Sequence, residues 1–400
     1  MDLYEGEIYW HQTIKNPPTY SSLTEDIECD VLIIGAGSSG AQIAYLLKDT
    51  ELNVVVVDKR KVGQGSTSAN TALIQYMGDK SITELVDAFG EETAFRHLKQ
   101  CEQAIKDMEA ISQTLPINPE FTNSNGLYYV SREEDVHKLR SDFDYLKKHG
   151  FQVEWLSEKE IGGRFPFEKS AGIYAYNEGE MNPLKYVYGL LEAAKQCGVR
   201  VYEQTEVKGK RLDKEGVTIY TTSDYAIRAK SLIVAGGYES IEFKKNENAK
   251  IASSFAVVTT PVKDLSAWYE KSMILTAWPY IYMRTTPDNR VIIGGLDEPI
   301  TDVTQRERIM LEKRKQLIQE FHTLFPNIMV EAEFYLGAAF GGTHDGLPMI
   351  GIEKGFPNCY YIYGYGENGT VYNMVLGKVV VDLITTGNSE NLDLYLQHDR

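Results

Sequence analysis

Short apolar runs alternate with amphipathic stretches along most of the chain. Residues 31–34 and 54–57 are continuous apolar runs, typical of strands buried on both faces, and residues 41–48 between them continue as a helix. Further strands are predicted at 126–130, 199–207, 217–221, 226–235, 360–363 and in most of 251–295. Further helices are predicted at 81–115, 132–149, 183–198, 305–324 and 370–385. The alternation indicates an α/β fold with a mostly parallel sheet.

Capping residues mark where several of these helices begin. Ser81 with Glu84, and Ser157 with Glu160, have the spacing of a capping box. Asn182 stands before Pro183, and proline is favoured at the first helical position. The first 28 residues are polar, and we expect them to lie as an arm on the surface of the body.

The turn after the first apolar run has the pattern G-x-G-x-x-G, formed by Gly35, Gly37 and Gly40. The first glycine permits a tight turn, the second lets the backbone approach a pyrophosphate, and the third lets the helix pack close to the strand. The helix then directs its free N–H groups and positive dipole end at the pyrophosphate. Asp58 ends the second run, where it can accept both hydroxyl hydrogens of an adenosine ribose. Together these features predict a dinucleotide site.

Three more glycine-containing segments lie far along the chain, at 65–70, 235–237 and 364–370. A nicotinamide-binding domain normally completes itself in one contiguous stretch, so this spread favours a discontinuous cofactor domain. We expect it to comprise residues 1–95, 180–245 and 335–400, with a substrate domain formed by 96–179 and 246–334. The last segment leads directly into an apolar helix, whose positive end would stabilise a reduced flavin.

Composition narrows the classes of partner. The chain has 41 basic and 57 acidic residues and no basic block, so we expect no nucleic-acid partner. Its four cysteines are far apart and show no metal-binding spacing, so we expect no metal site and reduced thiols in a cytoplasmic protein. We recognise no signal peptide and no apolar run near the ~20 residues of a membrane span. The oligomeric state stays open.

The chain resembles the D-amino-acid oxidase-like flavoprotein family. The resemblance rests on the glycine segments described above and on AKSLIVAGGYES, PYIYMRTTPDNRVIIGG, GTHDGLPMIG and YIYGYGENGTVYNMVLG. That family includes glycine oxidase, sarcosine oxidase and γ-glutamylputrescine oxidase. The resemblance implies a Rossmann-like FAD-binding domain with a mostly parallel sheet and an α+β substrate domain. It also implies oxidation of an amine or N-substituted amino compound to an imine by hydride transfer to flavin N5, followed by hydrolysis. The residues expected to bind FAD are Gly35, Gly37, Ser38, Ser39, Gly40, Asp58, Lys59, Gly65, Ser66, Thr67, Val207, Gly236, Gly366, Asn368, Gly369 and Thr370.

The chain also departs from the family's pattern. Ala338 stands where sarcosine oxidases attach flavin through a cysteine, so we expect noncovalent FAD. Phe340 replaces the carboxylate-gripping arginine of glycine oxidases, and Gln75 stands where sarcosine oxidases place arginines. The position of the oxygen-activating lysine of sarcosine oxidases falls near Ile292 of this chain. The usual carboxylate grips are therefore missing, which argues against a simple α-amino acid as substrate.

Four residues are candidates for substrate chemistry. Alternation puts Tyr280, Tyr282 and Arg284 on one strand face, where the tyrosines could form an aromatic cage and Arg284 could hold a carboxylate. Alternatively, Arg284 makes a structural ion pair and the tyrosines pack the sheet. His344 would be the base if the same fold oxidised a hydroxy acid instead, and Asp345 is expected to cap a turn. A flavin-bound protein with a structural or electron-relay role is the remaining alternative.

Overall fold

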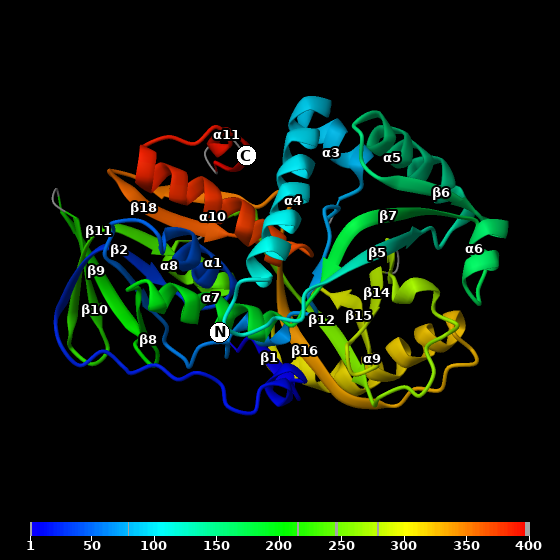
Figure 1. Cartoon of the computed structure of the whole chain (residues 1–400), viewed down its shortest axis with the longest axis horizontal. Coiled ribbons are helices and arrows are strands. Elements are labelled where there is room, and N and C mark those ends of the chain that lie inside the picture. Colours follow the sequence, from blue (N-terminus) through cyan, green and yellow to red (C-terminus); the bar gives the residue numbers. More distant parts are fainter. Residues whose placement is uncertain (1, 79, 214–215, 245–246, 278–279, 397–400) are drawn as a thin grey trace.

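The computed structural model describes residues 2–78, 80–213, 216–244, 247–277 and 280–396. Within these residues the strands form two sheets, a larger one of ten strands and a smaller one of eight, which lie side by side (Figure 1). The predicted fold class is confirmed, because the smaller sheet is mostly parallel with helices packed on it and the larger is mostly antiparallel.

The smaller sheet is built around five parallel strands. Their order is β18 (Phe356–Tyr363), β11 (Ala226–Val234), β2 (Ile27–Ile34), β3 (Val54–Val57) and β8 (Arg200–Tyr202). Antiparallel strands extend it: β17 (Met349–Glu353), β10 (Gly216–Thr221) and β9 (Val207–Asp213). Ile34 pairs with both Val57 and Val234, so these strands end at one edge of the sheet. Ligands bind at such an edge in open parallel sheets.

The larger sheet carries strands from nearly the whole chain. In order these are β1 (Tyr4–Gly6), β16 (Ala332–Thr343), β12 (Ala249–Thr259), β15 (Val291–Glu298), β14 (Tyr280–Thr285), β13 (Met273–Ala277), β5 (Thr122–Tyr129), β7 (Ala171–Glu180) and β4 (Leu73–Ile74), with β6 (Val153–Ser157) beside β7. The predicted domain limits stay a prediction. By sheet membership β1, β4 and β16 belong with the larger sheet.

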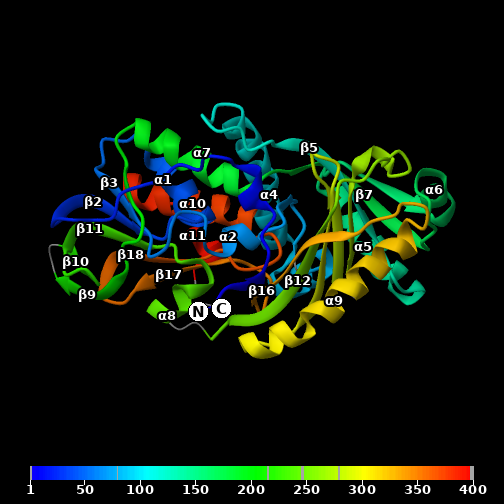
Figure 2. The same cartoon turned by 90° about the horizontal axis from the view of Figure 1, so that it is seen from below.

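Helices cover both sheets. Against the smaller sheet pack α1 (Ser38–Leu47), α7 (Pro183–Gln196) and α10 (Gly369–Thr386). Against the larger sheet pack α5 (Val136–Lys148), α6 (Glu158–Arg164) and α9 (Val303–Leu324), and Figure 2 shows α9 along its outer side. The shorter helices are α2 (Ser66–Ala69), α8 (Ser240–Phe243), α11 (Leu392–Tyr395) and the 3-10 turns η1 (Trp10–Thr13), η2 (Glu133–Asp135), η3 (Gly237–Glu239) and η4 (Tyr269–Lys271).

Three sequence predictions need correction. The helix expected at 81–115 is two helices, α3 (Ile82–Phe89) and α4 (Glu91–Ser112), because Gly90 has φ 81° and interrupts the helical backbone. The strand expected at 199–207 breaks after β8, since Gln204 has a positive φ of 51° and β9 begins only at Val207. Both predicted capping boxes are present, at Ser81 and Ser157.

The N-terminal arm is the third correction, because it does not lie only on the surface. Leu3, Tyr9 and Trp10 are buried, and β1 pairs with β16. The indole of Trp10 donates a hydrogen bond to the Asn70 carbonyl at 2.8 Å. A few apolar side chains within a polar segment are enough to dock it, since each buried side chain of this size contributes about 1.5–3 kcal/mol.

Candidate active site

A deep cavity lies where the carboxyl ends of the parallel strands face the larger sheet. The turns after β2, β3, β11 and β18 line one side, and strands β12, β14, β15 and β16 line the other. The cavity therefore reaches from the turns of the smaller sheet to the face of the larger sheet.

The glycine turn has the geometry that the sequence predicts. Gly35 has φ 109°, and a Cβ there would collide with the carbonyl of Ala235 on the neighbouring strand. A Cβ at Gly40 would collide with the Gly35 carbonyl, so only glycine lets α1 begin this close to the turn. Gly37 lines the cavity, and a Cβ there would come within 3.1 Å of Thr67 Oγ1. The backbone is consequently exposed to whatever occupies the cavity.

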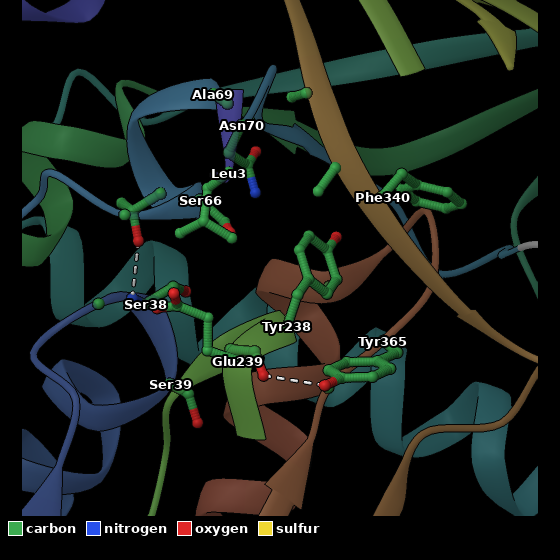
Figure 3. Close-up of a pocket in the computed structure, with 18 of the residues that line it drawn as sticks. Leu3, Ser38, Ser39, Ser66, Ala69, Asn70, Tyr238, Glu239, Phe340 and Tyr365 are labelled. Atoms are coloured by element: carbon green, nitrogen blue, oxygen red, sulfur yellow. Dashed lines mark hydrogen bonds between the residues drawn. The ribbon is translucent and has the colours of Figure 1, made fainter. Parts of the chain in front are cut away.

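The start of α1 is open to a ligand. It has no side-chain cap, and the N–H of Ser38 donates to Thr67 Oγ1 at 3.0 Å. Ser39 lines the cavity, and its buried hydroxyl has no hydrogen-bond partner within the described residues. Figure 3 shows Ser38 and Ser39 at this end of the cavity. Uncapped N–H groups and an unsatisfied hydroxyl at a helix N-terminus suit a phosphate group.

Asp58 sits at the end of β3 and ties the turn together. One carboxylate oxygen accepts from the N–H of Ala36 and the other from the N–H of Arg60, both at 2.8 Å. Burial raises the pKa of this carboxyl, although the two amides act in the opposite direction. Each oxygen keeps a further lone pair, so both can also accept a ribose hydroxyl.

Lys59 and Arg60 follow directly and both bind Glu239, a residue that the sequence analysis missed. Glu239 accepts from Lys59 Nζ at 2.9 Å and from two Arg60 nitrogens at 2.8 and 2.9 Å. Burial alone would raise the pKa of Glu239, but the bonds from Arg60 and Lys59 lower it to about 2. All three residues line the cavity, so Lys59 reaches it as one of two cations that share the Glu239 carboxylate.

The glycine segment after β18 brings a second helix start to the cavity. Gly366 has φ 121°, Gly366, Gly369 and Thr370 line the cavity, and α10 begins without a side-chain cap. Asn368 is not among the lining residues. Its amide nitrogen instead donates to the carbonyl of Gln75, and its amide oxygen is buried without a partner in the described chain.

Most of the other predicted cofactor residues also line the cavity: Gly65, Ser66, Thr67, Val207 and Gly236. Gly40 does not line the cavity. Its role is to let α1 pack close to the turn, because a side chain there would collide with the Gly35 carbonyl. The sequence analysis did not predict Leu3, Tyr238 and Asp297, which also line the cavity. Leu3 is brought there by the pairing of β1 with β16, and Asp297 by its place on β15.

The end of the cavity against the larger sheet is rich in aromatic groups. Tyr280 and Tyr282 both line it, with ring centroids 5.4 Å apart. Tyr238 packs against Phe340 and Tyr365 with centroid distances of 6.5 and 5.2 Å, and Figure 3 shows these three around the same space. Burial raises the pKa of the Tyr282 phenol, so it stays protonated at neutral pH.

Arg284, which we predicted as a substrate residue, does not line the cavity. Its guanidinium donates to the carbonyls of Thr71 at 2.7 Å, Met181 at 2.9 Å and Thr285 at 3.2 Å, and lies 3.6 Å from Glu180. It shares a strand face with the tyrosines, but each residue advances about 3.3 Å along a strand. Two residues beyond Tyr282, the same strand face is already covered by the protein core. The contacts of Arg284 are those expected if it makes a structural ion pair and does not bind the substrate.

His344 also lies outside the cavity. It is exposed, and its backbone N–H donates to the Asn248 carbonyl at 3.1 Å. Asp345 accepts from the N–H of Leu347 at 3.2 Å, the turn-capping contact expected of it. The turn follows the end of β16 at Thr343, and neither His344 nor Asp345 lines the cavity.

The residues present fit FAD in particular. The uncapped start of α1 and the Ser39 hydroxyl can receive a pyrophosphate, and Asp58 can receive the ribose. The uncapped start of α10 offers a second positive end at the other side of the same cavity. Among the described residues, no group of three or more His, Cys, Asp or Glu side chains is arranged to hold a metal ion. No helix in the same residues has the length and apolarity to cross a membrane.

Comparison with known proteins agrees with this geometry. The family of FAD-dependent oxidoreductases called DAO has a model that matches residues 30–383. The putative Rieske 2Fe-2S iron-sulfur protein YhfW of Bacillus subtilis strain 168 is 29% identical over 387 residues, covering 94% of this chain and 72% of that protein. The γ-glutamylputrescine oxidoreductase of Escherichia coli strain K12 is 22% identical over 404 residues, covering 97% of this chain and 90% of that protein.

The fold is that of a solved relative. The crystal structure of glycine oxidase from Geobacillus kaustophilus aligns with a TM-score of 0.79 at 20% identity, covering 93% of this chain and 99% of that one. The family match spans most of the sequence and includes every glycine segment that lines the cavity. The chain therefore belongs to the DAO family of FAD-dependent oxidoreductases, and FAD is its cofactor.

Proposed function

We propose that this protein oxidises the C–N bond of an amine or N-substituted amino compound to an imine, which water then hydrolyses. The aromatic end of the cavity carries the proposal. Tyr280, Tyr282, Tyr238 and Phe340 line it, and aromatic faces attract cationic or partly cationic amines. Bound FAD would supply the two-electron acceptor, taking hydride at N5.

The charges around the cavity support an amine more than an amino acid. Among the described lining residues, the basic ones are Lys59 and Arg60, and both are bonded to Glu239 at the nucleotide end. Asp297 and Glu367 add acidic groups to the lining. A free substrate carboxylate would meet no uncommitted cation here, whereas an amine meets π-faces and carboxylates. A carboxylate-binding role for Arg284 is unsupported, because its guanidinium already donates hydrogen bonds to backbone carbonyls.

The protein's part in the reaction is then to bind and orient. The tyrosines hold the amine against the cofactor, and the docked N-terminal arm helps to exclude water through Leu3, which lines the cavity. A substrate that binds as the ammonium first gives its proton to water, and the neutral amine then reacts without a dedicated base. A hydroxy acid would need a base beside its carbinol, and His344 stands outside the cavity.

An anaerobic reduction screen tests the proposal. The purified FAD-loaded protein is mixed without oxygen with amines, N-methyl amino acids, polyamine derivatives and hydroxy acids, and bleaching of the flavin band is recorded. We expect bleaching by members of the amine classes. Bleaching by hydroxy acids alone would overturn the proposal, and bleaching by none of them would favour a structural or electron-relay role.

A further inference from the structure

Three polar side chains lead from the cavity wall into the core of the larger sheet. Gln75 lines the cavity just after β4, Tyr128 lies on β5, and Glu178 lies on β7. The Tyr128 hydroxyl is 3.2 Å from Gln75 Oε1 and 2.7 Å from Glu178 Oε1. Gln75 is also fixed at its backbone, where its carbonyl accepts from the Asn368 amide. The three side chains therefore form a connected unit that ends at the cavity.

With the Gln75 amide oxygen toward Tyr128, as in this structure, the hydrogens along these two contacts can be paired in only one way. Tyr128 has one hydroxyl hydrogen but faces two acceptor oxygens. If Glu178 is protonated, it donates to the Tyr128 oxygen, and Tyr128 donates onward to Gln75. If Glu178 is ionised, it takes the Tyr128 hydrogen, and the Gln75 amide must turn its nitrogen toward Tyr128 for that contact to be paired.

The surroundings of Glu178 favour the protonated form. Its side chain is fully buried, one carboxyl oxygen has no partner within the described residues, and no cation is among the groups that shift its pKa. Gly126 packs directly against that oxygen. Burial raises the pKa of Glu178 to about 8, although hydrogen bonds from the Tyr128 hydroxyl and the Tyr76 backbone act in the opposite direction.

The protonated form also sets which end of the Gln75 amide faces the cavity. With Oε1 held by Tyr128, the amide nitrogen is the free end. It has no hydrogen-bond partner in the described chain, and it is not sealed in protein because Gln75 lines the cavity. The Gln75 amide is a neutral hydrogen-bond donor with no uncommitted cation nearby. It therefore suits a neutral acceptor, because an ionised acceptor would be buried without an opposite charge.

We propose that Gln75 is a specificity-determining residue whose amide N–H binds a neutral carbonyl group of the substrate, and that Tyr128 and protonated Glu178 are positioning residues that orient it. This rests on the proposed function, because it adds a carbonyl acceptor to the amine substrate. Other titratable groups near the unit are Tyr76, beside Glu178, and Tyr280, beside Tyr128. Burial raises the pKa of Tyr76 and Tyr128 well above the usual value, so neither titrates near neutral pH.

The first test uses N-methylacetamide as a neutral carbonyl probe and acetate as the anionic comparison. Binding of each is measured by perturbation of the flavin absorbance in the FAD-loaded protein at pH 7. We expect Gln75→Met to weaken N-methylacetamide binding about threefold to tenfold, the effect of one neutral hydrogen bond, with unchanged FAD content. No binding to the wild type, no loss in Gln75→Met, or selective loss of acetate binding would each overturn the proposal.

A matched pair of variants tests the positioning role. Tyr128→Phe and Tyr76→Phe each remove one buried hydroxyl beside Glu178, but only Tyr128 bonds to Gln75. We expect N-methylacetamide binding to fall in Tyr128→Phe as it does in Gln75→Met, and to stay unchanged in Tyr76→Phe. Equal effects of the two variants would show that the unit does not orient Gln75.

The buried proton has its own readouts. We expect N-methylacetamide binding to weaken as pH rises through about 8 in the wild type, and to be independent of pH in Glu178→Gln, whose neutral amide can still donate to Tyr128. The infrared difference between the two proteins at pH 7 should contain a carboxylic-acid C=O stretch. Its absence would overturn the protonated unit. The probe is not oxidised, so these results stand whichever substrate class bleaches the flavin.

Discussion

Replacing Arg284 by methionine separates a structural role from a substrate role. The guanidinium is 1% exposed and donates to three backbone carbonyls, with Glu180 at 3.6 Å and the Trp10 ring centroid at 5.3 Å. Burial lowers the pKa of Arg284 and raises that of Glu180, so the attraction between them does not outweigh the loss of water. Methionine would fill similar volume but supply no donor.

The expected loss of stability follows from what is left unpaired. Removing one partner of a buried ion pair costs about 3–5 kcal/mol, and the freed carbonyls of Thr71 and Met181 act in the same direction. Unfolding entropy is about 2.1 cal/mol/K per residue. For a cooperative chain of 400 residues, Arg284→Met should therefore lower Tm by about 4–6 °C.

The assay is thermal unfolding of the FAD-loaded protein, alongside flavin reduction by the best substrate of the screen. Glu180→Gln added to Arg284→Met should recover part of the loss, because no buried carboxylate then lacks its partner. Kinetics of the surviving enzyme should be intact. An unchanged Tm together with a raised KM would refute this reasoning and return Arg284 to the substrate.

Three further outcomes are expected. Acid precipitation should release yellow FAD into the supernatant, because Ala338 stands where related enzymes have an attachment cysteine; colour in the pellet would contradict it. Asp58→Ala should weaken FAD binding by about 1–3 kcal/mol in a flavin titration, since it loses a ribose acceptor and unties the amides of Ala36 and Arg60; an unchanged affinity would place the ribose elsewhere. Glu178→Gln should gain stability relative to the wild type as pH rises from about 4.5 to about 8, because folded Glu178 keeps a proton that the unfolded chain has lost. The difference in the free energy of unfolding should change by roughly 5 kcal/mol at most over this range. A constant difference in denaturant midpoints across the range would exclude the raised pKa.

Local patterns were sufficient for the nucleotide half of the protein. The turn from Gly35 to Gly40 and the acid at Asp58 depend on backbone space and on where adjacent parallel strands end, and both requirements are visible in consecutive residues. Helix starts at Ser81 and Ser157 were equally predictable, because a capping box is a contact between residues three apart. The break at Gly90 was the exception, since glycine interrupts a helix only where its neighbours permit a positive φ.

The other half of the cavity was decided by tertiary structure. Period-two alternation correctly placed Tyr280, Tyr282 and Arg284 on one face, but it carries no information on where along the strand that face passes from the cavity into the core. Leu3, Glu239 and the Gln75–Tyr128–Glu178 unit join residues up to hundreds of positions apart, so no local pattern could bring them together. The sequence by itself determined the cofactor and the fold, because backbone geometry is local; the substrate end was determined only by packing, because burial and charge pairing depend on which distant segments meet.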